Sequence, residues 1–197
     1  MKHCRHNGIF NHEEVIKLEL EPAKFKHLLP LPVTLITTCD AKGRINAAPY
    51  SSIMPVLRPL DLIAFASNPS HDTLRNIRKT GHFVVNIIGR PSYKKAIRCA
   101  KEYPFGVNEL KEIGLDTIPS SLVDPPRVRE ALGWIEAKKV EDVSGKNYVL
   151  LVGKVLVAEM NDRYMKGKDL DELPVTLLFP YFRALGEPLA RRDDFDV

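Results

Sequence analysis

Strand-like segments lie towards both ends of this 197-residue chain, and helical segments lie between them. In the early group, residues 33–40 (VTLITTCD) and 45–54 (INAAPYSSIM) flank a turn at Gly43, a pattern typical of a β-hairpin. In the late group, residues 134–143 and 148–160 flank a second short turn. Because a short turn joins neighbouring strands only when they run antiparallel, this order predicts an antiparallel sheet in an α+β or mostly-β barrel.

Helical spacing marks the middle of the chain. Leu74 and Ile77 recur at a helical interval, Ser70 stands at the expected N-cap, and Gly81 stands where the helix should end. Further helices are predicted at residues 92–103 and 107–114, and further strands at 14–20, 62–67 and 82–89. The helices therefore form an excursion between barrel strands, which argues against an alternating parallel sheet.

Composition indicates an ordinary soluble globular protein, with 44% hydrophobic and 27% charged residues. The 29 basic and 25 acidic residues are scattered along the chain, which suits an anionic small molecule at least as well as nucleic acid. Three cysteines are too few for a disulfide framework, and no segment has the length and apolarity of a signal peptide or a membrane span. These features predict a cytoplasmic location.

The chain is short enough for one main domain. We expect a flexible N-terminal tail at residues 1–13, a split-barrel domain at 14–180 and a charged C-terminal tail at 181–197.

Several common cofactor motifs are missing. No two glycines are separated by one residue, so the sequence has no G-x-G-x-x-G dinucleotide fingerprint, and it has no G-K-[ST] phosphate loop. The only dense group of candidate metal ligands lies in the N-terminal tail and consists of His3, Cys4, His6 and His12. Because chain termini are usually mobile, no native metal site is expected.

Residues 46–52 (NAAPYSS) have two interpretations. The simpler one is a strand that ends at Pro49, followed by a turn capped by Ser51 and Ser52. The alternative is a ligand cradle, because backbone groups and hydroxyls at an interrupted sheet edge can bind a planar heterocycle or a phosphate.

Residues 32–56 (PVTLITTCDAKGRINAAPYSSIMPV) and 65–88 (FASNPSHDTLRNIRKTGHFVVNII) resemble the flavin reductase-like family, which has the FMN-binding split-barrel fold. Residues 114–140 and 145–160 continue the pattern, so the likeness covers roughly residues 28–160. It implies a homodimer that binds FMN, with FAD as the alternative, without a covalent bond near the shared interface. The flavin-binding residues that it implies are Asn46, Ala48, Pro49, Tyr50, Ser51, Ser52, Ser67, Asp72, Thr73 and Asn76. His71 is added to this set as a candidate cation for the phosphate.

Physical reasoning supports part of this assignment. The first backbone amides of the helix lie at Asp72 and Thr73, where free donors and the helix dipole favour an anion such as a flavin phosphate. Asp72 itself has an alternative role as an ordinary first-turn carboxylate that occupies the same amides. Tyr50 either covers the flavin ring or belongs to the core. The cation for the phosphate is left open among four residues: His71, Arg75, Arg78 and Lys79.

Three other residues have mainly structural interpretations. Cys39 and Cys99 are expected to be small buried residues, and Asn86, inside an apolar run, is expected to make a structural hydrogen bond. Asn147 stands near a point where the family often has a histidine that could meet a nicotinamide, which leaves NAD(P)H use open.

The resemblance implies an oxidoreductase of the flavin reductase or flavoredoxin type. Electrons would pass from NAD(P)H through FMN to free flavin, ferric iron or a partner protein, and the flavin would perform the chemistry without a catalytic side chain. The alternative is a non-catalytic electron-transfer protein reduced by a protein donor. A nucleic-acid-binding barrel is disfavoured because the aromatic and basic repetition of such surfaces is missing.

Overall fold

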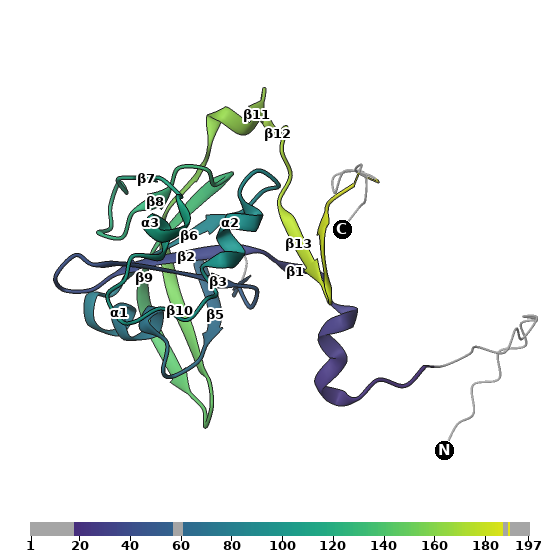
Figure 1. Cartoon of the computed structure of the whole chain (residues 1–197), viewed down its shortest axis with the longest axis horizontal. Coiled ribbons are helices and arrows are strands. Elements are labelled where there is room, and N and C mark those ends of the chain that lie inside the picture. Colours follow the sequence, from purple (N-terminus) through teal and green to yellow (C-terminus); the bar gives the residue numbers. More distant parts are fainter. Residues whose placement is uncertain (1–17, 57–60, 187–188, 190–197) are drawn as a thin grey trace, which may run out of the picture.

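The computed structural model describes residues 18–56, 61–186 and 189, whose main element is a curled antiparallel sheet (Figure 1). Across the sheet, the strands are β3 (Ile45–Tyr50), β2 (Thr34–Cys39), β6 (His82–Ile87), β9 (Gly133–Ser144), β10 (Val149–Met160), β5 (Leu62–Ser67) and β4 (Met54–Pro55). Every pair of neighbours is antiparallel. The antiparallel α+β architecture and both predicted hairpins are confirmed.

The sheet curls because its two edge strands are consecutive in the chain. Only residues 51–53 separate the end of β3 from the start of β4 at the opposite edge. Four Cα–Cα steps span at most about 15 Å, so the two edges must lie near each other and the sheet forms a half-barrel split along this seam.

Ser52 stabilises the crossing between the two edges. The Ser52 hydroxyl donates to the carbonyl of Ala66 on β5 at 3.0 Å and accepts from the amide of the same residue at 3.2 Å. The hydroxyl thus satisfies the two backbone groups of Ala66 that no neighbouring strand pairs with. The strand itself continues through Pro49 to Tyr50, so the interpretation that ended it at Pro49 is wrong by one residue.

Both faces of the sheet are buried, which explains the continuous apolar runs in its strands. Successive side chains of a strand point to opposite faces. On β6, Phe83 and Val85 join the cluster inside the curl, whereas Val84 joins the cluster on the other face. The helix α1 (Asp72–Thr80) contributes Leu74 and Ile77 to the inner cluster, as its helical spacing predicted.

Asn86 is fully buried in this apolar strand, and its side-chain amide is satisfied by two backbone groups. Its Nδ2 donates to the carbonyl of Leu35 at 2.8 Å, and its Oδ1 accepts from the amide of Val128 at 2.7 Å. The predicted structural hydrogen bond is confirmed.

The start of α1 differs from the prediction. His71 occupies the N-cap, and Ser70 does not, because the Oδ1 of Asn68 accepts from both the amide and the hydroxyl of Ser70. Asn68 and Ser70 therefore form an Asx turn, and the Ser70 hydroxyl is not available to cap the helix. The predicted end is confirmed: Gly81 is the C-cap, with a φ of 79° that favours glycine.

The other helices are shorter than predicted. They are α2 (Tyr93–Arg98) and α3 (Glu109–Ile113), separated by a segment that contains Pro104 and Gly106. Proline and glycine both disfavour the interior of a helix, so neither predicted helix extends through this segment. No helix in the described part of the chain combines the length and apolar character needed to cross a bilayer.

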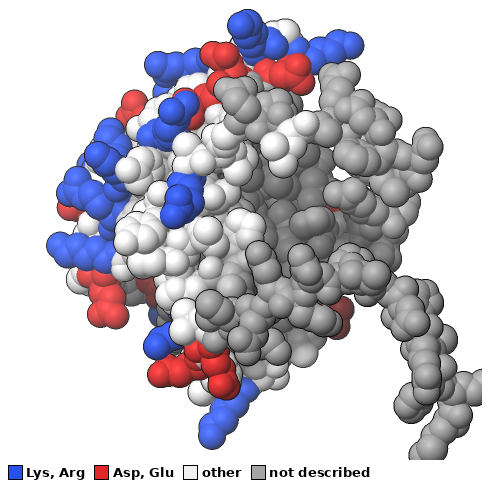
Figure 2. Space-filling view, turned by 90° about the vertical axis from the view of Figure 1, so that its right-hand side faces the viewer, with Lys and Arg blue, Asp and Glu red and all other residues white. Residues whose placement is uncertain are grey.

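A small sheet projects from the barrel (Figure 1). It contains β1 (Leu31–Pro32), β13 (Val175–Leu178) and β14 (Tyr181–Ala184), and with the preceding 3-10 helix η1 (Pro22–Leu28) we call it the arm. On the described part of the face turned to the viewer in Figure 2, charged side chains lie mainly at the margins and uncharged ones at the centre.

The remaining short elements are the strand pairs β7 (Thr117–Ile118) with β8 (Arg127–Val128) and β11 (Met165–Lys166) with β12 (Asp169–Leu170), and the 3-10 helix η2 (Asp162–Tyr164). The strand predicted at residues 14–20 is wrong for residues 18–20, which form no strand, and its first residues lie outside the described ranges. The domain boundaries stay a prediction, with β14 inside the segment assigned to the C-terminal tail.

Candidate functional site

A cavity of about 420 Å³ lies between the edge strand β3, the start of α1 and the segment that follows α2. The predicted flavin-binding residues that line it are Asn46, Ala48, Pro49, Tyr50, His71, Asp72 and Thr73. The structure therefore brings the two predicted stretches, which are distant in the sequence, into the lining of one cavity. Its volume is within the range of small-molecule and cofactor sites.

The outer edge of β3 faces this cavity because no strand pairs with it there. Pro49 has no amide hydrogen, so it suits a position whose backbone points away from the partner strand β2. Ala47 stands two residues earlier and has the same orientation: its amide donates to the Oε2 of Glu109 at 2.9 Å instead of to a strand. The edge thus presents backbone groups to the cavity.

The start of α1 also faces the cavity, and no side chain caps it. The carboxylate of Asp72 forms an ion pair with Arg75, one turn further along the helix, and makes no hydrogen bond to the first amides. Of the two roles considered for Asp72, occupation of these amides is therefore wrong. The uncapped helix start leaves donors for an anion.

A buried hydrogen-bond network fixes this helix start against the sheet. The Nδ2 of Asn46 lies 3.1 Å from the Oγ1 of Thr73 and 3.3 Å from the Oγ1 of Thr38, which also accepts from the Nδ2 of Asn76 at 3.1 Å. Asn76 is 2% exposed and does not line the cavity. It lies behind the cavity wall and positions α1.

Tyr50 is mainly a core residue. It is 7% exposed and packs edge to face on Phe65, with ring centroids 4.9 Å apart. Its hydroxyl lies 2.9 Å from the Oγ of Ser67 and reaches the cavity wall, so Ser67 positions Tyr50 without lining the cavity itself. Burial raises the pKa of Tyr50, which keeps the hydroxyl protonated at neutral pH.

The four predicted cations differ in position. His71 lines the cavity. Arg75 is held by Asp72 and stacks on the ring of Phe105, with its guanidinium carbon 3.6 Å from the ring centroid. Arg78 pairs with Asp142 at 2.9 Å, and Lys79 follows it in the last turn. His71 is therefore the best placed of the four.

The third wall of the cavity was missed by sequence reasoning. It comes from the end of α2, the following segment and the start of α3, and contains Cys99, Ala100, Lys101, Glu102, Tyr103 and Glu109. No local pattern marked these residues as a site. Conversely, Ser51 and Ser52 are predicted site residues that lie in the crossing to β4 and do not line the cavity.

The cysteines support their structural interpretation. Cys39 and Cys99 are free and each is 4% exposed. Burial, with a contribution from the charge of Glu109, raises the pKa of Cys99 to about 12, so its thiol is not activated.

The cluster of His3, Cys4, His6 and His12 lies outside the described residues, within which no group of three candidate ligands could hold a metal. The cytoplasmic location stays a prediction.

Glu109 is a buried carboxyl group in the cavity wall, 8% exposed. Burial raises its pKa, and the nearby charge of Asp72 adds to this, while the amides of Ala47 and of Glu109 itself act in the opposite direction. The charged form is therefore less favourable in the folded protein than in the unfolded chain. By linkage, the stability that this group contributes is present in acid and lost as pH rises through the folded pKa.

We expect Glu109→Gln to be at least as stable as the wild type at neutral pH, since glutamine keeps an oxygen for the amide of Ala47 and removes a buried charge. The difference in the free energy of unfolding between the two proteins should shrink in acid, where the wild-type carboxyl group is protonated. Thermal unfolding of both proteins across the acid-to-neutral range measures this. Glu109→Ala is the control: it leaves the Ala47 amide unpaired and should cost about 1–3 kcal/mol. A glutamine variant as unstable as the alanine variant would contradict the argument.

Comparisons with known proteins concern the family and the fold of this chain. The sequence model of a family described as "Flavin reductase like domain" matches residues 26–179. An uncharacterized protein of Methanothermobacter thermautotrophicus is 42% identical over 154 residues, which are 76% of this chain and 73% of that protein.

Two solved structures have the same fold. Nitrilotriacetate monooxygenase component B from Bacillus cereus has a TM-score of 0.78 and 24% identity, covering 89% of this chain and 99% of that one. Flavoredoxin from Methanosarcina acetivorans has a TM-score of 0.77 and 22% identity, covering 90% and 95%. At these identities the likeness concerns the fold alone.

Proposed function

Because this chain belongs to the flavin reductase-like domain family, we propose that it binds FMN without a covalent bond in the cavity between β3 and α1. We propose further that it is an oxidoreductase of the flavin reductase or flavoredoxin type. The observation that carries this proposal is the uncapped start of α1, which opens into a cofactor-sized cavity beside a free sheet edge.

The phosphate of FMN fits the start of α1. The first-turn amides have no capping side chain, and the helix dipole adds a partial positive charge at this end. Thr73 adds a hydroxyl, and His71 adds an imidazole that can donate a hydrogen bond. Asp72 does not compete for these amides because Arg75 holds its carboxylate.

The flavin ring fits the edge of β3. An isoalloxazine is flat, with hydrogen-bonding atoms along its rim. The unpaired edge of β3 offers it backbone carbonyl acceptors, since Pro49 has no amide hydrogen and the amide of Ala47 is held by Glu109. Ala48 and Pro49 supply small or flat apolar surface on this wall. FMN is preferred to FAD because the single helix start suits one terminal phosphate, and FAD is tested alongside it.

Bound FMN would supply reversible uptake of two electrons, accepted from NAD(P)H and passed to free flavin, ferric iron or a partner protein. The residues of the chain bind and orient the cofactor. The helix start and Thr73 hold the phosphate end, the edge of β3 holds the ring, and Tyr50 keeps one wall rigid through Ser67.

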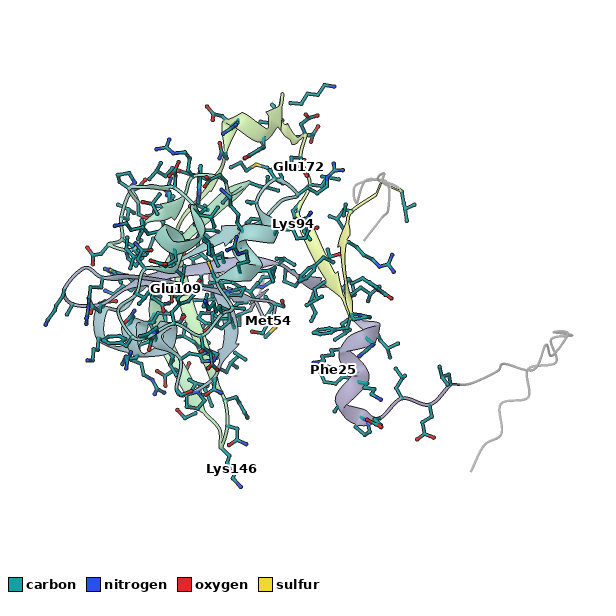
Figure 3. All side chains as sticks on the ribbon, viewed as in Figure 1. Phe25, Met54, Lys94, Glu109, Lys146 and Glu172 are labelled. Carbon is teal, nitrogen blue, oxygen red and sulfur yellow. The ribbon has the colours of Figure 1, made fainter. Side chains whose placement is uncertain are left out.

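A protein donor in place of NAD(P)H is the second candidate function. Asn147, which stands where a nicotinamide contact was considered, belongs to the turn between β9 and β10 and does not line the cavity. Its neighbour Lys146 marks the far end of this hairpin, well away from Glu109 in the cavity wall (Figure 3). A nicotinamide bound in the cavity would therefore not meet residue 147 of the same chain.

A homodimer is also proposed, on the basis of a second, strongly apolar cavity of about 500 Å³. It includes Ile53, the last residue of the crossing from β3, and Met54 and Pro55 of β4. Met54 is 51% exposed, a large apolar side chain that a second copy would cover. Because only a few residues separate the two cavities, a copy seated here would stand close to the flavin.

Binding of FMN and riboflavin to Thr73→Val tests the site. The variant removes a hydroxyl at the phosphate end, so its Kd for FMN should rise about tenfold, as expected for loss of a hydrogen bond to a charged group. The Kd for riboflavin, which has no phosphate, should rise less than the Kd for FMN, because riboflavin is affected only by the lost Asn46–Thr73 hydrogen bond in the cavity wall. Quenching of flavin fluorescence measures both, with FAD as a third ligand. If the wild-type protein takes up neither FMN nor FAD at micromolar concentration, the proposed function is wrong.

The electron donor is tested with the FMN-loaded protein without oxygen. Bleaching of the flavin absorbance by NADH or NADPH would support the reductase. Bleaching by dithionite but by neither nucleotide would exclude direct oxidation of NAD(P)H and favour a protein donor.

A further inference from the structure

A strongly basic segment borders the proposed flavin cavity. Residues 89–101 (GRPSYKKAIRCAK), which include α2, contain basic residues and no acidic ones. All of these basic side chains are exposed. We call them the basic patch: Arg90, Lys94, Lys95, Arg98 and Lys101.

Among the residues that the structure describes, few neighbours neutralise this charge. Within the described ranges, Arg90 is the one member of the patch with an ion pair, to Glu172 at 3.1 Å. Lys95 donates to the backbone carbonyl of Gly114 at 2.6 Å, which leaves its charge in place. Lys94 and Arg98, one helical turn apart, therefore present free positive charge on the same side of α2.

The position of the patch links it to the redox site. α2 ends at Arg98, and the next residues, Cys99, Ala100 and Lys101, line the proposed flavin cavity. A large partner attracted to the patch would therefore stand at the mouth of this cavity. Its own redox group would come close to the flavin without entering the barrel.

We propose that the basic patch docks an acidic electron-carrier protein, which exchanges electrons with the flavin. This inference rests on the proposed function and names the partner of the same site. A dinucleotide fits the patch less well, because only Lys101 reaches the cavity and the other cations spread outward along α2. A second copy of the chain would bring like charges together if the patch met itself.

The electron balance is simple for a one-electron carrier. Two reduced carriers each give up one electron, and these two electrons with two protons from solvent convert oxidised flavin to its hydroquinone. Each carrier leaves oxidised by one electron. Complementary charge raises the association rate of such partners by about 10- to 1,000-fold at low salt and loses its effect as salt screens it.

The test compares two double variants with equal changes in net charge. Lys94→Glu with Arg98→Glu reverses the patch, and Lys146→Glu with Lys168→Glu reverses two exposed lysines elsewhere, in the turns of the β9–β10 and β11–β12 pairs. Figure 3 shows Lys94 and Lys146 far apart on the molecule. The probe is a one-cluster [4Fe–4S] ferredoxin, a small acidic iron–sulfur protein that carries one electron. Its binding is measured by fluorescence anisotropy, and its electron transfer by anaerobic stopped flow.

The expected result is salt-sensitive binding to the wild type and to the control variant, with a Kd at least about tenfold higher for the patch variant at low salt. The rate of flavin reduction by ferredoxin should fall in parallel, whereas FMN affinity and reduction by dithionite should not change. Equal ferredoxin binding by both variants, or none by the wild type, would overturn the docking proposal and leave the flavin site intact. A rise in KM for NADPH alone would assign the patch to the dinucleotide instead. Failure of the wild type to bind flavin would overturn both proposals.

Discussion

Ala48→Trp is expected to abolish flavin uptake while the barrel stays folded. Ala48 lies on the edge strand β3, and its small side chain leaves room in the cavity. An indole at this position would fill the space proposed for the flavin ring. We expect the Kd for FMN to rise about 100-fold or more, a loss of about 2.7 kcal/mol of binding free energy. Flavin fluorescence titration measures the affinity, and circular dichroism verifies the fold.

Two further variants make this prediction decisive. Ala48→Ser keeps the cavity open and should bind FMN like the wild type. Ala100→Trp enters the same cavity from the opposite wall, from an exposed position where a large side chain does not disturb the sheet. Normal FMN binding by a folded Ala100→Trp or Ala48→Trp protein would place the flavin elsewhere.

Glu136→Ala is expected to cause the largest loss of stability, about 3–5 kcal/mol. Glu136 is fully buried on β9 and pairs with Arg127 at 2.6 Å. It also accepts from the amides of Ser121 and Leu122, each at 2.7 Å. Without the carboxylate, the buried Arg127 guanidinium keeps only Glu159 as an ion-pair partner, and two amides lose their acceptor. Thermal unfolding should show a Tm lower by roughly 10 °C.

The pH dependence of this loss has a defined sign. Burial alone would raise the pKa of Glu136, but the amides of Ser121 and Leu122 together with Arg127 outweigh it, and the pKa lies below its ordinary value. The stability contributed by the carboxylate is therefore present at neutral pH and lost as pH falls through the folded pKa. The difference in the free energy of unfolding between the wild type and Glu136→Ala should therefore become smaller in acid.

The control is Glu136→Gln, which keeps one acceptor oxygen for the amides and should lie between the wild type and Glu136→Ala. A Tm for Glu136→Ala within about 2 °C of the wild type would contradict the assigned role of the ion pair, since a loss of only about 1 kcal/mol corresponds to such a shift.

Much of the fold could be predicted because its signals are local. β-Branched residues in 34–39, the turn at Gly43 and the apolar run 82–87 each specify a strand or turn from neighbouring residues alone. The N-cap shows the limit of such signals: Ser70 had the right residue type, but the side chain of Asn68 engaged it first and the helix began one residue later.

The candidate site was predictable on two of its walls. The resemblance to the flavin reductase-like family implied the residues of β3 and of the start of α1, and the free amides expected at a helix start supported part of that assignment. Glu109 and Lys101 carried no comparable signal, because a carboxylate in the first turn of a helix and a lysine in a loop are ordinary features. The reverse holds for Ser52: the sequence predicts it as a flavin ligand, but in the structure its hydroxyl binds the backbone of β5.

By itself, the order of strands, turns and helices in the sequence determined an antiparallel barrel with a helical excursion, because hydrophobic period and turn chemistry act over a few residues. Only the tertiary structure decided which segments face one another: it curled the sheet until β3 and β4 became its two edges, and it placed residues 99–109 across the cavity from α1. The physical reason is that packing between distant segments depends on the combined shape of many side chains, which no short stretch of sequence specifies.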